Sequence, residues 1–545
     1  MKSCPTCSRV YSNDALRFCR HDGALLRPAP EDPTRLLYAE DSIHPQSQTG
    51  ELSDDLASRA GATSSSLTVP MPAPRRRATR RKAIDSLAVL PFTNEGGDSK
   101  TGYLSDGITE GIINSLSQLP RLRVLPRSTV FRHRGAGVDP LGVGQQLGVR
   151  AVLTGRVAEV EGRLVIRTEL IDVWEESQLW GEQYRREPAD IFALQEEISR
   201  DISEKLRLKL TGDERRRLAK RYTENTDAYR AYLQGRHYVT SKRTAEWISK
   251  GIDCFQRAID LDPNYALAYS GLAEAHGLLA SSTGEQPPRE AYPKAQAAAR
   301  KALALDPSLA EAHTALGFSL LLYDYDLEGA RRAFRRAARL NPNHPNAHDG
   351  LAFYYNATSQ AAKSLAECRE SRRLDPLSPF PEVNFGWAHY FARKYDLAAA
   401  QGRKALQMDA HFAFAHWIIG LALAQDGDAA GAVESLERGV ETSGGGLTFR
   451  AHLAYAYARA GRDADARGAL AELEEAARRR RYVSAYYFAI ARLGLGETDA
   501  ALEQLERALE ERAGFLAYLR VEPIFDPVRD EARFRQLVER VGVKG

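Results

Sequence analysis

The chain has 545 residues, 43% of them hydrophobic and 27% charged, which is typical of a folded protein with several domains. Its formal net charge of +3 is too small to indicate nucleic-acid binding by the whole molecule, and its 5 cysteines are too few for a disulfide-rich secreted scaffold. No apolar run reaches the roughly 18 residues of a membrane span, and the first residues do not form a secretory signal. We therefore expect a soluble cytoplasmic protein.

Residues 1–30 contain a cysteine pattern that is typical of a metal site. Cys4 and Cys7 form a closely spaced pair, and Cys19 begins a second knuckle. The spacing resembles that of a small bacterial zinc ribbon, whose ligands hold a structural zinc ion tetrahedrally. The fourth ligand is Asp22 by position, since it stands where a second cysteine would be, or His21 by chemistry, since imidazole binds zinc better than one carboxylate. A ribbon that has lost its metal is the alternative.

Residues 31–84 are rich in proline, serine, threonine and alanine, and we expect a disordered linker. The linker ends in a basic run, whose members are Arg75, Arg76, Arg77, Arg80, Arg81 and Lys82. Such a run can contact nucleic acid or anionic lipid, or it can be the solvated end of the linker. It contains no aromatic residue that could stack on a base, which weakens the nucleic-acid interpretation.

From residue 85 to residue 212 the pattern changes to that of an α/β domain in two or three layers. Short apolar runs predict strands, longer runs with apolar residues at helical spacing predict helices, and two alternating runs separated by a glycine turn predict a hairpin. The predicted strands are 87–92 and 122–125, the helices 103–119, 140–147 and 191–210, and the hairpin strands 151–157 and 164–172.

Residues 222–512 repeat with a period near 34 residues. A short proline-centred element returns at intervals of 44, 35, 34 and 34 residues, in the forms Asp262-Pro263-Asn264, Asp306-Pro307-Ser308, Asn341-Pro342-Asn343, Asp375-Pro376-Leu377 and Asp409-Ala410-His411. Between these elements, small residues such as Gly317 and Ala330 let two helices approach, and Phe334 fills the space between neighbouring pairs. This pattern resembles the tetratricopeptide repeat, and it predicts an α-solenoid of about eight units. We expect residues 513–545 to cap its open end.

A second resemblance covers most of the α/β domain. The phrases Leu87–Phe92, Tyr103–Glu110, Leu147–Gly155, Leu179–Glu182 and Asp190–Glu196 resemble the amino-terminal domain of TolB. In that family, tetratricopeptide repeats follow the domain, and relatives place the pair behind a serine/threonine kinase, a class III adenylate cyclase or a CadC-type regulator. The resemblance implies a sensory or partner-binding output arm, and it implies no chemistry of its own.

The repeat resemblance also implies a binding groove on the concave face, which is lined by the first helix of each unit. The candidate groove residues are Phe318, Phe353, Trp387, Trp417, Leu421 and Tyr455. An apolar, aromatic stripe of this kind suits a protein or peptide ligand with hydrophobic anchors. The alternative is that these side chains pack between helices.

The motifs of the common phosphate-handling and hydrolytic enzymes were not found in the sequence, so we expect no catalytic residues. The fold is expected to be mostly α, with the solenoid preceded by the α/β domain and the small zinc ribbon. The function expected is a non-catalytic protein–protein interaction scaffold in bacterial signalling or regulation. Two alternatives stay open: a nucleic-acid-linked regulator that uses the ribbon and the basic run, and a component or remnant of a kinase or adenylate cyclase signalling protein.

Overall fold

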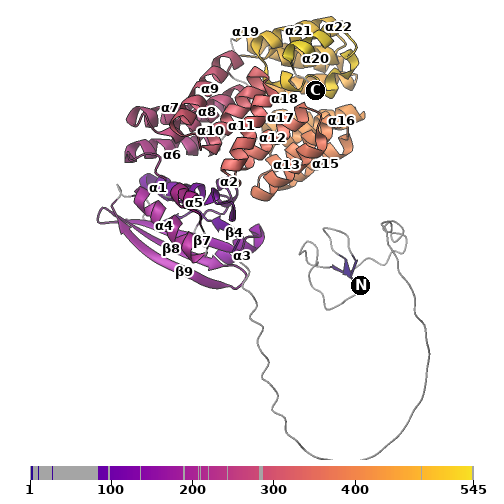
Figure 1. Ribbon diagram of the computed structural model, residues 1–545. Helices are drawn as coiled ribbons and strands as arrows, with labels where there is room; N and C mark the ends of the chain where they lie inside the picture. The colour runs from indigo at the N-terminus through magenta and orange to yellow at the C-terminus, as the bar shows by residue number, and fades with distance from the viewer. Residues whose placement is uncertain are drawn as a thin grey trace, which may run out of the picture. The chain divides into compact units, whose positions relative to one another are not determined.

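The computed structural model describes residues 84–95 and 99–542, with short gaps at 136, 188–190, 207, 209, 219, 242–243, 282–285 and 480–481, and the backbone of three short strands nearer the N-terminus (Figure 1). The chain divides into two compact units, Met1–Thr79 and Arg80–Gly545. In the first unit, β1 (Lys2–Ser3) pairs antiparallel with both β2 (Val10–Tyr11) and β3 (Arg27–Pro28). The predicted zinc ligands, the linker and the basic run lie outside the described residues.

The second unit begins with a mixed sheet in the order β6-β4-β7-β8-β9, with β5 beside β7. Its strands are β4 (Ser86–Val89), β5 (Thr93–Asn94), β6 (Arg123–Val124), β7 (Ala151–Val160), β8 (Arg163–Asp172) and β9 (Ser177–Arg186). Strand β4 runs parallel to β6 and β7, whereas β7, β8 and β9 form an antiparallel meander. The sequence-based prediction stopped at β8. Strand β9 was missed because it is a polar edge strand in which only Tyr184 is fully buried.

Helices α1 (Ser99–Ser117) and α4 (Ile191–Lys205) cover one face of this sheet, on the side toward the solenoid (Figure 1). Their apolar residues recur at helical spacing and are fully buried, as Ile108, Ile112 and Leu116 in α1 illustrate. The short α2 (Arg127–Val130) and α5 (Gly212–Leu218) complete the domain. Helix α3 (Pro140–Leu147) packs on β7 through Gly144, whose Cβ, if present, would lie 2.8 Å from Val152.

Between residues 226 and 511 the described chain forms eight helical hairpins, which stack side by side (Figure 1). They are α6 (Thr226–Ser241) with α7 (Ala245–Leu261), α8 (Ala266–Ser281) with α9 (Pro288–Leu305), α10 (Ala310–Ser319) with α11 (Leu327–Leu340), α12 (Pro345–Ala357) with α13 (Ala361–Leu374), α14 (Phe380–Phe391) with α15 (Tyr395–Met408), α16 (Ala413–Asp426) with α17 (Ala429–Thr442), α18 (Leu447–Arg459) with α19 (Asp463–Arg478), and α20 (Ala485–Gly494) with α21 (Thr498–Glu511). A π-helical turn, η3 (Leu320–Asp324), follows α10.

The roles that the sequence predicted for the repeated small and large residues are confirmed in the third hairpin. The ring of Phe334 in α11 fits between Gly317 of α10 and Gly350 of α12. A Cβ would lie 2.6 Å from that ring at Gly317 and 2.3 Å from it at Gly350, so a larger residue at either place would push the helices apart. This contact holds one hairpin together and joins it to the next.

In the first three hairpins, the recurring Asp/Asn-Pro element ends the second helix by a local hydrogen bond. The side-chain oxygen of Asp262 accepts a hydrogen bond from the backbone N–H of Asn264 at 2.9 Å, and Asp306 accepts one from Ser308 at 3.0 Å. The carboxylate thus stabilises a turn at the point where the proline prevents the helix from continuing. The period of 34 residues in the sequence is therefore the period of these turns.

Two of these turns also hold the α/β domain. The Asn343 amide donates hydrogen bonds to the backbone carbonyls of Ser117 at 2.8 Å and Leu122 at 2.9 Å, and all these groups are buried. The Ser128 hydroxyl donates to the Asp375 carboxylate at 2.6 Å. One hydrophobic core continues from the α/β domain into the first two hairpins. The α/β domain and the solenoid therefore form one structural unit.

Candidate binding surface on the inner face of the solenoid

The structure places the six predicted groove residues on the first helices of consecutive hairpins. Phe318 lies on α10, Phe353 on α12, Trp387 on α14, Trp417 and Leu421 on α16, and Tyr455 on α18. The last four are nearly inaccessible, with exposed fractions of 8%, 4%, 1% and 6%. Their rings contact one another along the stack: the centroids of Phe318 and Phe353 lie 6.0 Å apart, and those of Trp387 and Trp417 lie 4.9 Å apart. The residues thus share one continuous surface, which we call the inner face.

The chain's own residues 513–528, here called the C-terminal segment, cover this inner face. The segment contains two 3-10 helices, η4 (Gly514–Tyr518) and η5 (Pro523–Val528), and it leads to α22 (Ala532–Val541), which packs on α21. We expected this part of the chain to cap the open end of the stack. Helix α22 packs on α21, the last helix of the stack, as a cap would, whereas residues 513–528 cross back over the first helices of the earlier hairpins, where aromatic side chains are available to them.

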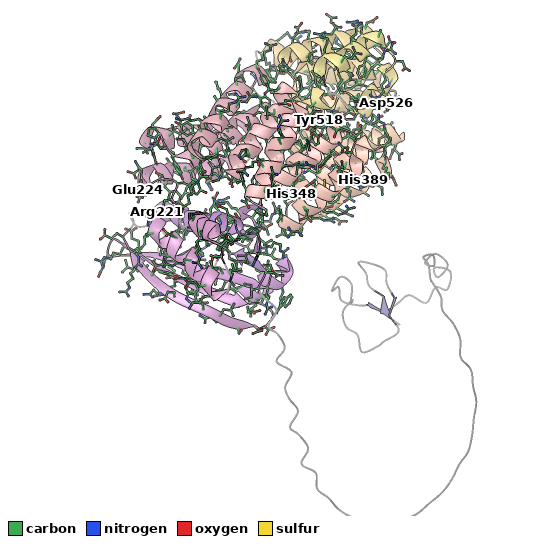
Figure 2. All side chains as sticks on the ribbon, viewed as in Figure 1. Arg221, Glu224, His348, His389, Tyr518 and Asp526 are labelled. Carbon is green, nitrogen blue, oxygen red and sulfur yellow. The ribbon has the colours of Figure 1, made fainter. Side chains whose placement is uncertain are left out.

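Two rings of the C-terminal segment make most of the aromatic contacts. Tyr518 stacks on Phe391 with centroids 5.3 Å apart and planes inclined by 7°, and it also contacts Phe353 at 6.4 Å. Phe515 meets the edge of Trp417 at 5.7 Å and stacks on Tyr486 of α20 at 5.6 Å. Figure 2 marks Tyr518 amid the helices of the solenoid. The rings of several hairpins and of the segment thus form one aromatic layer.

Polar groups of the solenoid hold the backbone of the same segment. The Tyr325 hydroxyl donates a hydrogen bond to the carbonyl of Ala513 at 3.0 Å. The Arg393 guanidinium donates to the carbonyl of Val521 at 2.8 Å and to the Asp526 carboxylate at 2.7 Å. Bonds to backbone carbonyls fix the path of a bound segment without selecting its side chains.

One carboxyl group of the segment is fully buried. Oxygen Oε1 of Glu522 accepts hydrogen bonds from the Tyr390 hydroxyl at 2.5 Å and from the backbone N–H of Ile524 at 3.2 Å. Burial raises the pKa of Glu522 to about 7, although these bonds and the charges of Arg393 and Arg529 lower it in part. The carboxyl group therefore changes its charge close to neutral pH.

Two polar atoms at this surface lack a hydrogen-bond partner among the residues that the structure describes. They are the hydroxyl oxygen of Tyr518 and the indole Nε1 of Trp417. A buried polar group without a partner reduces stability, since it has lost its hydrogen bond to water. The C-terminal segment is consequently complementary to the inner face in shape, whereas the two buried polar atoms are not matched by hydrogen-bonding groups.

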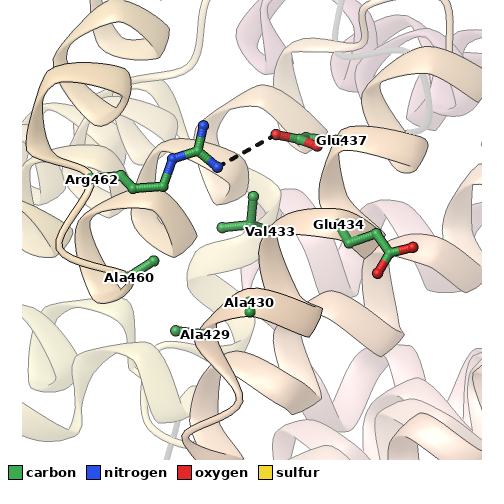
Figure 3. Close-up of a pocket in the computed structure, with 7 residues that line it drawn as sticks. All are labelled: Ala429, Ala430, Val433, Glu434, Glu437, Ala460 and Arg462. Atoms are coloured by element: carbon green, nitrogen blue, oxygen red, sulfur yellow. Dashed lines mark ion pairs between the residues drawn. The ribbon is translucent and has the colours of Figure 1, made fainter.

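A depression on the outer side of the solenoid's α17 offers no comparable chemistry. It has a volume of about 510 Å³ and lies on the second helices, between α17 and the turn before α19 (Figure 3). Alanines form its floor, and its polar edge is the ion pair of Arg462 with Glu437 at 3.8 Å. Because Arg462 also pairs with Asp465 at 2.6 Å, its charge is already balanced. We assign the depression no function.

The sequence did not predict that the C-terminal segment covers the inner face. The predicted residues lie together, yet the partners that matter most were not singled out: Tyr390, Phe391, Arg393, Tyr518 and Glu522. A signal for the segment was present, because aromatic residues recur at positions 515, 518 and 525, after the repeat pattern has ended. Nothing local in the sequence indicated which hairpins they would contact.

Comparisons with known proteins find one matching family model and one similar protein. The model of the family described as HilA/YgeH-like transcriptional regulator, second domain, matches residues 82–201. A protein of Rhizobium meliloti (strain 1021) named putative adenylate cyclase 3 is 37% identical over 191 residues, which is 35% of this chain and 32% of that protein. The chain thus spans about a third of the length of this relative. The TolB resemblance remains a hypothesis.

Among solved structures, similar chains include tetratricopeptide repeat proteins. TTC0263 of Thermus thermophilus is 18% identical, with a TM-score of 0.31 over 36% of this chain and 98% of that one. The human IFIT1 dimer with PPP-AAAA is 14% identical, with a TM-score of 0.40 over 64% of this chain and 77% of that one. Cut9 in the Cut9–Hcn1 structure is 15% identical, with a TM-score of 0.36 over 63% and 66%. In the described part of this chain, no helix combines the length and apolar character that crossing a bilayer requires.

Proposed function

We propose that the chain is a non-catalytic protein-interaction scaffold in bacterial signalling or regulation, and that its solenoid binds a partner through the inner face. The observation that carries this proposal is the C-terminal segment itself. The inner face holds a short segment by ring contacts at Phe353 and Phe391 and by hydrogen bonds from Tyr325 and Arg393 to backbone carbonyls. These contacts are the ones by which a peptide ligand would be recognised.

The fixed α/β domain supports the same function. Because Asn343 and Asp375 hydrogen-bond to Ser117 of α1 and Ser128 of α2, a partner on the solenoid would be held at a set position relative to the sheet. We propose that the domain is the part through which the scaffold passes its signal to other components. Its match to a domain of transcriptional regulators supports a regulatory setting for the chain.

Site-specific photo-crosslinking in living bacteria tests the proposal. A photoreactive amino acid at Phe318, which is half-buried on α10, should give a cross-linked species with a partner protein. The matched control is Leu397 on α15, which is 41% exposed and lies on a second helix. If both positions give the same bands, or only Leu397 gives one, the inner face is not where the partner binds.

A second candidate function is that of a nucleic-acid-linked regulator, which the match to a transcriptional regulator domain favours. The basic run from Arg75 to Lys82 and the predicted zinc ribbon would then supply the contact. A DNA mobility shift that weakens steeply with salt, and that disappears when the six basic residues are changed to glutamine, would support this function. The same variant would still bind its protein partner in the scaffold interpretation.

A third candidate, membership of an adenylate cyclase or kinase signalling protein, rests on the relative named putative adenylate cyclase 3. The aligned part is 32% of that protein, so the similarity transfers no cyclase activity to this chain. Purified chain incubated with ATP and Mg²⁺ distinguishes the two interpretations. Formation of cyclic AMP would contradict the scaffold proposal.

A further inference from the structure

We propose that the C-terminal segment is a built-in ligand of the inner face, and that the partner docks by replacing it with a segment of the same chemistry. That chemistry is two aromatic rings three residues apart, followed four residues later by a hydrogen-bond acceptor, as in Phe515, Tyr518 and Glu522. The inference rests on the proposed function and deepens it, since it names the kind of partner.

The ring spacing follows from the backbone of the segment. Residues 514–518 form a 3-10 helix, in which positions three apart lie on the same face. Phe515 and Tyr518 therefore project together toward the solenoid, one to Trp417 and Tyr486 and the other to Phe391. A foreign segment needs the same spacing to fill both ring sites at once.

The acceptor position follows from Tyr390. Its hydroxyl is buried and donates to Glu522, so a segment without an acceptor there would leave a buried donor unpaired. The nearby bond from Arg393 to the Val521 carbonyl can form with any residue at that place. The inner face therefore selects two rings and an acceptor, together with the buried apolar side chains of Leu516, Leu519 and Val521 between them.

The built-in ligand has two defects that a partner can avoid. The Tyr518 hydroxyl has no hydrogen-bond partner among the described residues, and the Glu522 carboxyl is fully buried. A segment with phenylalanine in place of Tyr518 has no unpaired hydroxyl, and one with glutamine in place of Glu522 keeps the acceptor and carries no charge at any pH. Such a segment can displace the tethered one, although tethering gives the C-terminal segment a high local concentration.

The test uses fluorescence anisotropy with the full-length chain and three labelled peptides that cover residues 511–530. One has the natural sequence, the second carries Tyr518→Phe and Glu522→Gln, and the third is scrambled. We expect the doubly substituted peptide to bind the intact chain at least about tenfold more tightly than the natural peptide, which corresponds to about 1.4 kcal/mol. The scrambled peptide should not bind.

Variants of the chain test whether its own segment competes. Tyr518→Ala weakens the tethered segment and should raise the affinity of both specific peptides by about a hundredfold or more. Tyr518→Phe in the chain keeps the ring and strengthens the tethered segment. It should therefore lower the affinity of both specific peptides, which is the opposite of the effect of Tyr518→Ala. Tyr238→Ala on α6, away from the inner face, should change nothing. Failure of both specific peptides to bind the folded Tyr518→Ala chain would show that the segment is a permanent part of the core.

The outcomes separate this inference from the proposed function. If Phe318 still cross-links to a partner while neither specific peptide binds, the scaffold function stands and the built-in ligand is excluded. If the peptides bind and the variants compete as expected, but no partner cross-links at Phe318, the segment is an exchangeable ligand and the scaffold function of the inner face is contradicted.

Discussion

The ring of Tyr518 lies parallel to the ring of Phe391, with centroids 5.3 Å apart and planes inclined by 7°. One ring belongs to the C-terminal segment and the other to the end of α14 in the fifth hairpin. Only 5% of the Tyr518 side chain is exposed. This contact closes the inner face, and a partner that binds as we propose has to break it.

Tyr518→Ala should therefore reduce the stability of the solenoid, because it removes a buried ring and leaves a cavity. The loss expected for such a truncation is about 3–5 kcal/mol. Tyr518→Phe keeps the ring and removes a hydroxyl without a described partner, so it should leave stability unchanged or raise it. Urea unfolding followed by circular dichroism measures both, and a large loss in the phenylalanine variant would show that the hydroxyl is hydrogen-bonded.

Glu522 should make stability depend on pH. Its pKa rises from an ordinary 4.5 to about 7 on burial, so the folded state binds more protons than the unfolded state between these values. The stabilisation by Glu522 should consequently be full below about pH 4.5 and be lost as the pH rises through 7, by on the order of 3 kcal/mol. The groups that face the carboxyl are Tyr390, Arg393 and Arg529.

Glu522→Gln is the matched variant for this pH dependence. Its amide oxygen can accept the Tyr390 hydroxyl, and it carries no charge at any pH. The difference in unfolding free energy between pH 5 and pH 8 should shrink by about the amount assigned to Glu522. An unchanged pH dependence in the variant would assign the effect to another group.

Asn343→Ala should weaken the joint between the α/β domain and the solenoid. The change leaves the carbonyls of Ser117 and Leu122 without their donor, at a cost of about 1–3 kcal/mol for each. Limited proteolysis should cleave the α/β domain faster in this variant. Asn264→Ala, at the equivalent and exposed place in the first turn, is the control and should behave like the natural chain.

The purified chain should contain one zinc ion, and Cys4→Ser should abolish its binding, since a closed structural site needs four ligands. The fourth ligand is the residue, Asp22 or His21, whose change to alanine abolishes zinc binding. Elemental analysis after exhaustive dialysis gives the zinc content. A natural chain without zinc would contradict the zinc-ribbon prediction.

Sequence patterns predicted the parts of the fold that depend on fixed spacing. Phe334 meets Gly317 and Gly350 because each hairpin has a similar length, and that regularity is written in the period of the repeat. Strand β9 was missed because an exposed edge strand needs little apolar alternation. The local role of Asn343 in its turn was predictable, whereas its bonds to the α/β domain were not, since they join residues far apart in the sequence.

The candidate site likewise has one part whose position the sequence predicts and one part whose position it does not. The residues of the inner face follow from the repeat register, which places them on the first helix of each hairpin. The C-terminal segment has no such register, and its contacts come from several hairpins at once. Its position could therefore be learned only from the structure.

Hydrogen–deuterium exchange of residues 513–528 tests the central claim most directly. In the chain alone, the backbone amides of this segment should exchange slowly, as those of α14 do. With a saturating concentration of the peptide that carries Tyr518→Phe and Glu522→Gln, they should exchange fast, while α14 remains protected. Fast exchange in the chain alone, or slow exchange that saturating peptide does not change, would contradict the account.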